Sequence, residues 1–149
     1  MDVSTLLASH GHYLLQAGVL LLLLTSFEGF LIQSLASPRL GLSTHTLGAL
    51  LGVMLIALGL MWPKLDFGDA WPRLCAYAAF WCLIYSAFAT VVAVFLAALW
   101  AAGNEALPLA AGSAHGSPLQ EGVIKAFAYS AVPTAIISLL LIFWGLWRG

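Results

Sequence analysis

Four long apolar stretches, separated by short polar connections, set the strongest limit on how this chain can fold. They cover residues 13–35, 45–62, 73–103 and 118–147. A helix needs about 20 apolar residues to cross the hydrocarbon core of a bilayer, and its backbone groups must be paired within the segment. The pattern therefore predicts an all-α fold, an integral membrane four-helix bundle formed by residues 1–149 as a single domain.

Charged side chains are scarce along the whole chain. They make up 7% of the 149 residues, whereas a soluble domain carries roughly a quarter. The formal net charge of -1 also gives no reason to expect an electrostatic partner such as nucleic acid. We therefore expect a lipid membrane around this chain and no nucleic acid as a partner.

Four spans place both termini of the chain on one side of the membrane. Lys64, Arg73 and Arg148 fall on that side, and Arg39 and Lys125 fall on the other. Because basic residues are enriched in cytoplasmic connections, this distribution favours cytoplasmic termini.

His45 stands where the second apolar stretch begins. Neutral imidazole is the commonest side-chain metal ligand and the usual proximal ligand of haem. Gly48 and Gly52 follow at i+3 and i+7, on the same helix face, and would leave room for a flat macrocycle. The alternative is a helix-packing seam of the GxxxG type, with His45 as an interfacial residue. No other His or Cys stands at metal-ligand spacing to His45, so a multi-ligand zinc site is not expected.

Glu28 lies inside the first apolar stretch, between Phe27 and Gly29. A carboxylate at membrane depth is costly unless it is paired or protonated. Three interpretations stay open from the sequence. Glu28 would be a proton donor in catalysis, a proton-coupling site of a transporter, or a packing acid near the interface.

Other polar residues have both a functional and a structural interpretation. Tyr85 and Thr90 lie midway along the third stretch, where Tyr85 would donate to a substrate oxygen or bond a neighbouring helix. Arg39 would pair with cofactor carboxylates or extend to the membrane surface. His10 and His12 precede the first stretch, either close to a site or as an interfacial polar cap.

A series of short motifs, taken together with their order and spacing, resembles the hydroxylaminobenzene mutases. The resemblance runs from about His12 to Trp144. Its motifs are GHYLLQ at 11–16, SPRLGLSTH at 37–45, GLMWPK at 59–64, WAAG at 100–103, AAG at 110–112 and GSPLQE at 116–121. The resemblance implies a four-spanning enzyme, in the bacterial inner membrane, that acts on a small aromatic substrate. Its reaction is the intramolecular rearrangement of an aryl hydroxylamine to a 2-aminophenol, as in nitroarene degradation.

The chain also resembles, more distantly, the styrene oxide isomerases. The shared features are SHG at 9–11 and His45 with Gly52 downstream. Those isomerases hold ferric haem b through the histidine that matches His45, at subunit contacts of a trimer. The resemblance therefore implies haem b as cofactor, its iron as a Lewis acid, and a homo-oligomer that is a trimer in the isomerases. This chain departs from their pattern at Leu51 and Thr90, where an asparagine is common.

The resemblance implies the role of His45, and the positions of the other polar residues suggest theirs. His45 would be the metal ligand, and Tyr85 and Glu28 would hold the migrating oxygen and relay the proton. The predicted catalytic residues are Tyr85, Glu28 and Thr90, and the predicted cofactor-binding residues are His45, Gly48, Gly52 and Arg39.

Two other functions compete with a hydroxylamine mutase. One is an epoxide isomerase of the styrene oxide type. The other, from a different class, is a small proton-coupled exporter that uses Glu28, but it gives no role to His45 or Arg39. A haem-binding electron-transfer subunit would need two axial ligands, and only His45 has an obvious place.

Overall fold

The computed structural model describes residues 2–149 and has four long helices. Each is long and apolar enough to cross a membrane, and no strand occurs among the described residues. The predicted all-α membrane bundle is thereby confirmed. The long helices are α1 (Val3–Leu31), α2 (Pro38–Met61), α3 (Pro72–Trp100) and α5 (Pro118–Arg148), and the short elements are η1 (Ile32–Ser34), η2 (Trp62–Lys64) and α4 (Pro108–Ala111).

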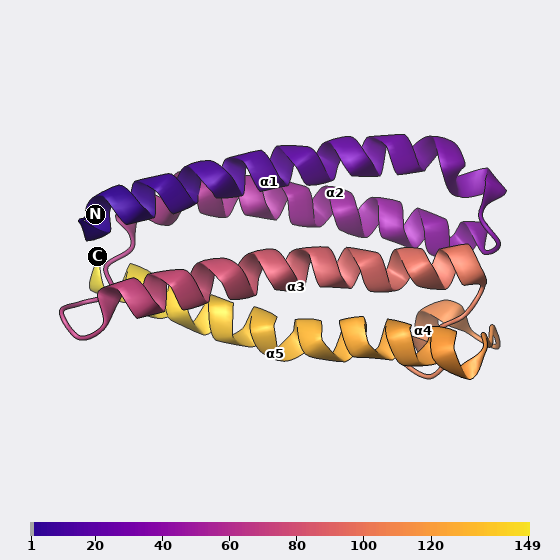
Figure 1. Cartoon of the computed structure of the whole chain (residues 1–149). Coiled ribbons are helices and arrows are strands. Elements are labelled where there is room, and N and C mark those ends of the chain that lie inside the picture. Colours follow the sequence, from indigo (N-terminus) through magenta and orange to yellow (C-terminus); the bar gives the residue numbers. More distant parts are fainter. Residues whose placement is uncertain (1) are drawn as a thin grey trace.

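The four long helices form two antiparallel hairpins that lie side by side (Figure 1). One hairpin is α1 with α2, the other is α3 with α5, and α2 packs against α3 between them. Both termini lie at the same end of the bundle (Figure 1), as four spans require. At the opposite end, the Ser37 N–H donates to the carbonyl of Ala98 at 3.0 Å and joins the two hairpins.

The helices extend beyond the apolar stretches that predicted them. α1 begins at Val3, where the Asp2 carboxylate accepts the Val3 N–H at 2.8 Å. His10 and His12 were expected before the first span, but both lie inside α1. Hydropathy marks only the part of a helix that matches the hydrocarbon, whereas a capping residue marks where the helix begins.

The second and third helices also differ from the expected bounds. α2 begins at Pro38, so His45 lies two turns inside the helix instead of at its start. α3 ends at Trp100 and not at Gly103, because Ala101 takes a left-handed conformation with φ of 47°.

Glycines bring the backbones of α1 and α2 into direct contact. A Cβ on Gly11 would lie 2.7 Å from the Gly59 carbonyl oxygen, and a Cβ on Gly18 would lie 2.6 Å from that of Gly52. Both distances are shorter than any real Cβ contact. In membranes, where water drives no hydrophobic association, such close approach is a main source of helix packing energy. We call this line of contacts the glycine seam.

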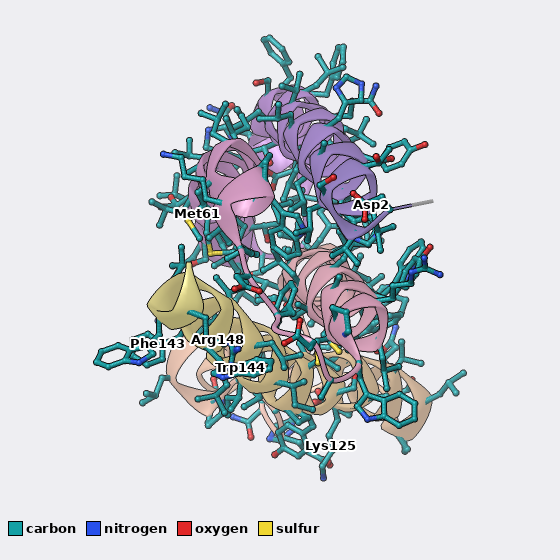
Figure 2. The ribbon with its side chains drawn as sticks, turned by 90° about the vertical axis from the view of Figure 1, so that its left-hand side faces the viewer. Asp2, Met61, Lys125, Phe143, Trp144 and Arg148 are labelled. Carbon is teal, nitrogen blue, oxygen red and sulfur yellow. The ribbon has the colours of Figure 1, made fainter. Side chains whose placement is uncertain are left out.

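Away from the helix contacts, side chains radiate outward around the whole bundle (Figure 2). Many large apolar residues are exposed in the isolated chain, as lipid contact requires. Near the chain termini, Figure 2 shows Trp144 beside Arg148, whose guanidinium carbon lies 5.6 Å from the ring centre. This is the tryptophan and arginine pairing expected at a membrane interface.

The glycine seam predicts that a single methyl group destabilises the bundle. Gly18→Ala should lower the free energy of unfolding by about 1–3 kcal/mol, because the new Cβ collides with the backbone of α2 as well as with the Ile56 side chain. Unfolding in mixed micelles, followed by circular dichroism, measures the change.

The matched control is the same substitution at an open position of α5. A Cβ on Gly122 would meet nothing within 4 Å. Gly122→Ala should therefore leave stability unchanged or raise it by up to about 1 kcal/mol. Equal effects of the two substitutions would show that the seam is not a close backbone contact.

Candidate functional site

The structure brings His45 and Glu28 together, one from each helix of the first hairpin. His45 Nδ1 lies 3.5 Å from Glu28 Oε2 and 3.0 Å from the carbonyl oxygen of Thr25. A Cβ on Gly29 would lie 3.1 Å from the imidazole Cε1, so the absence of a side chain there leaves room for the ring. One turn of α1 thus surrounds one edge of the His45 ring.

The contact with Thr25 assigns the tautomer of His45. A backbone carbonyl oxygen only accepts, so Nδ1 carries the proton and the lone pair is on Nε2. Hydrogen bonding of one ring nitrogen to a carbonyl is also how metal-ligating histidines are commonly held. Because the His45 side chain is 39% exposed, the ring is not enclosed by its own chain.

Glu28 is buried, with 8% of its surface exposed. Its two carboxyl oxygens have no hydrogen-bond partner of acceptable geometry among the described residues. A carboxyl group at membrane depth is expensive and is usually retained for function. His45, 3.5 Å away, is the titratable group that faces it.

Glu28 also forms part of the wall of an apolar cavity of about 310 Å³. Engineered cavities about half this size bind benzene, so one substituted aromatic ring fits. The polar groups at the wall come from Thr25, Glu28 and Thr44. The apolar lining comes from α1 and α3 and consists of Leu21, Leu24, Phe27, Leu31, Phe88, Val91, Val92 and Phe95. Glu28 is therefore in contact with both the cavity and His45.

Two predicted catalytic residues lie apart from this pair. The Ser130 hydroxyl donates to the carbonyl of Ala126 at 2.6 Å, so it accepts from the Tyr85 hydroxyl at 2.7 Å, across α3 and α5. The Thr90 hydroxyl donates to the carbonyl of Ser86, one turn back in its own helix. Neither Tyr85 nor Thr90 is among the described residues that line the cavity. The interhelical bond considered for Tyr85 is the contact that the structure shows.

The predicted cofactor glycines belong to the glycine seam. A Cβ on Gly48 would collide with the Thr25 hydroxyl, and one on Gly52 would lie 2.8 Å from Leu22 Cγ. This face of α2 is covered by α1 and is not an open surface for a macrocycle within one chain. The contacts of Gly48 and Gly52 within this chain are thus those of a helix-packing seam, the alternative to cofactor binding. Arg39, the other predicted cofactor residue, donates to the carbonyl of Leu109 at 3.2 Å.

Glu121 was not among the predicted site residues, yet it organises the connection between α3 and α5. Its buried Oε1 accepts the N–H groups of Gly103 and Gly116, both at 2.8 Å, and Oε2 accepts that of Glu105 at 3.3 Å. Ser117 and Gln120 close a capping box at the start of α5. The connection between α3 and α5 is therefore anchored at the end of the bundle that carries His45 and Glu28. The GSPLQE motif was a sequence signal for this role.

Thr25 and Thr44 were also missed as parts of the site. Thr25 follows Gly11 and Gly18 at seven-residue spacing and so lies on the seam face of α1. Within residues 2–149, no group of three His, Cys, Asp or Glu side chains is placed to hold a metal ion. A metal centre at His45 would therefore lack a set of three such ligands from the described part of this chain.

Fold and site together define a small four-helix membrane protein with an acid and a histidine beside an apolar cavity. The family model for styrene oxide isomerase matches residues 10–147, and the chain belongs to that family. It is therefore an isomerase, which gives the exporter alternative no support.

Two relatives from Ectopseudomonas oleovorans extend this result. Hydroxylaminobenzene mutase HabB is 41% identical over 133 residues, which cover 89% of this chain and 79% of the relative. Hydroxylaminobenzene mutase HabA is 38% identical over 136 residues, which cover 91% of this chain and 98% of the relative. The resemblance predicted from the sequence motifs is confirmed. No solved structure matches the chain.

The contact of Tyr85 with Ser130 predicts a structural role for the tyrosine. Tyr85→Phe should lower the free energy of unfolding by about 1 kcal/mol, because one interhelical hydrogen bond is lost. Turnover should change by less than about twofold, since the hydroxyl contacts neither His45 nor Glu28. Ser130→Ala should have the same effect on stability. A large loss of turnover with unchanged stability would instead place Tyr85 in catalysis.

Proposed function

We propose that this chain is a membrane-bound mutase that rearranges aryl hydroxylamines of the hydroxylaminobenzene type to 2-aminophenols. Its relatives HabA and HabB, which align over most of the chain, are named hydroxylaminobenzene mutases. The structural observation in its favour is the pairing of His45 with Glu28 beside a cavity of about 310 Å³. The reaction is an isomerisation, so it needs no electron donor.

Haem b is the cofactor that we propose, and the residues present fit it. His45 has Nδ1 fixed by the Thr25 carbonyl and Nε2 available as a ligand, and its ring is partly exposed. Arg39, six residues earlier in α2, would be the partner of a haem carboxylate. When bound, ferric haem would supply a Lewis acid that polarises the N–O bond of the substrate.

The remaining chemistry falls to the chain itself. The hydroxyl oxygen leaves the nitrogen and bonds to the ortho carbon of the ring. That carbon loses a proton, and the nitrogen gains one, so atoms and charge balance. Glu28 would accept the ring proton and return it to the nitrogen, because its carboxyl group lies at the cavity wall beside His45.

The apolar walls have their own role in this mechanism. Aromatic and aliphatic side chains such as Phe27, Phe88 and Phe95 would hold the substrate ring and limit bulk water. Water would otherwise attack the electron-poor ring, often at the para position.

The same need to exclude water applies to an epoxide, whose opening must be protected from hydrolysis. Because the family model is that of styrene oxide isomerase, we keep epoxide isomerisation as the second candidate.

We further propose a homo-oligomer, a trimer by analogy, in the bacterial inner membrane with cytoplasmic termini. The support is the partial exposure of His45 at membrane depth. A neighbouring subunit would complete the surroundings of the cofactor on that side.

The first test is the reaction of the purified enzyme with hydroxylaminobenzene labelled with ¹⁸O in the hydroxyl group. The 2-aminophenol formed should retain the label, because the oxygen migrates within one molecule. Glu28→Gln should lower kcat by about 10²–10⁴-fold, since an amide cannot relay the proton.

Two controls accompany this test. Glu105→Gln changes an exposed acid that pairs with Lys125 at 3.3 Å, and it should leave the rate near that of the wild type. Styrene oxide, assayed in parallel, decides between the two substrates. Full exchange of the label with water would refute the mutase, and an unchanged rate in Glu28→Gln would remove Glu28 from the mechanism.

The cofactor is tested by the absorption spectrum of the detergent-purified protein. The wild type should show a Soret band in proportion to its protein content, and His45→Ala should lose it because Nε2 is the proposed ligand. His12→Ala is the matched control, since His12 is exposed and bonds Gln16 at 3.1 Å. Full haem content in His45→Ala would contradict the ligand assignment.

A further inference from the structure

A second cavity lies between α1 and α3, towards the end of the bundle where the chain begins. Its volume is about 540 Å³. Aromatic rings form much of its wall, and the described residues that line it include no charged side chain. The polar and aromatic residues of the lining are Ser9, His10 and Tyr13 of α1 and Tyr77, Phe80 and Trp81 of α3.

His10 is the unusual residue of this cavity. It is 4% exposed, its ring stacks on Phe80 with the ring centres 4.2 Å apart, and Tyr77 meets it edge-on at 5.0 Å. Its buried Nδ1 has no hydrogen-bond partner among the described residues. A buried polar atom without a partner is destabilising, so a phenylalanine would serve better if the position were only for packing.

This cavity is separate from the site at His45. His10 and Glu28 are 18 positions apart in the same helix, α1, which corresponds to about 27 Å along the axis. The two cavities share no lining residue. Nothing in the proposed rearrangement uses His10.

We propose that the cavity at His10 binds a small uncharged phenol or aniline, that is, one aromatic ring with a hydroxyl or amino group. The rings of Tyr77, Phe80 and Trp81 provide stacking and edge contacts for an aromatic ring. A neutral imidazole carries one donor and one acceptor nitrogen, and Ser9 adds a hydroxyl-bearing residue to the lining. The absence of charge in the lining disfavours ionic ligands.

The ligand class includes aminophenols and the aryl hydroxylamines, so the cavity would hold substrate or product of the proposed reaction at the opposite end of the bundle. The binding itself does not rest on that reaction. It is measured directly, without turnover, and its failure is therefore distinct from failure of the proposed function.

The experiment is a titration of the full-length protein with phenol, with the histidine rings labelled with ¹³C and ¹⁵N. The His10 resonances, assigned from their loss in His10→Phe, should shift and saturate. Toluene, which has the ring without the hydroxyl, and cyclohexanol, which has the hydroxyl without the aromatic ring, should bind about tenfold more weakly. Aniline should behave as phenol does.

The variants test the residue that carries the proposal. By equilibrium dialysis with labelled phenol, His10→Phe should bind about tenfold more weakly, because it keeps the stack on Phe80 but lacks both nitrogens. His12→Phe, at an exposed position of the same helix, should bind as the wild type does. Trp81 is 61% exposed, so Trp81→Leu should fold and also bind more weakly.

The results that would overturn the proposal are equally direct. Equal shifts with phenol and toluene would show an apolar groove without recognition of the polar group. Unsaturable shifts that follow the lipid concentration would show partition into the membrane. Unchanged phenol affinity in both His10→Phe and Trp81→Leu would show that the ligand binds elsewhere.

Discussion

The close contact of α1 with α2 is the constraint on which the rest of the structure depends. Gly11 and Gly18 on one helix touch Gly59 and Gly52 on the other, with no side chain between the backbones. Such contact permits a single register, because sliding either helix by one residue would place a side chain against a carbonyl. The same register places the Thr25 carbonyl opposite His45, where it fixes the tautomer of the ring.

In a membrane, the alignment of α1 with α2 also determines which polar side chains contact each other. In water, a solitary glutamate and a solitary histidine would each be solvated, and their positions would matter little. In lipid each needs a partner, and the seam makes Glu28 and His45 neighbours at 3.5 Å. Packing and the proposed function would therefore be coupled here, since a change that shifts α1 against α2 alters the geometry of the pair as well as stability.

The sequence predicted the four spans well, because hydropathy depends on each residue alone. It also singled out Glu28 and His45, since polar residues at membrane depth are few. It did not pair them, because a pairing depends on how two helices are aligned. The spacing of Gly11, Gly18 and Thr25 carried that information, but Gly48 and Gly52 were interpreted as room for a cofactor. For Tyr85 both a catalytic role and an interhelical bond stayed open, because the sequence could not show that Ser130 faces it.

An isomerase needs few chemical groups for its reaction, and the candidate site in this short chain contains few polar side chains. An isomerisation consumes no water and no electrons, so the enzyme has only to polarise one bond, move one proton and exclude solvent. A wet site would favour hydrolysis or attack at the wrong ring carbon. In the proposed mutase, the scarcity of polar side chains around Glu28 would therefore favour the reaction, because it would keep the substrate oxygen from being exchanged for that of water.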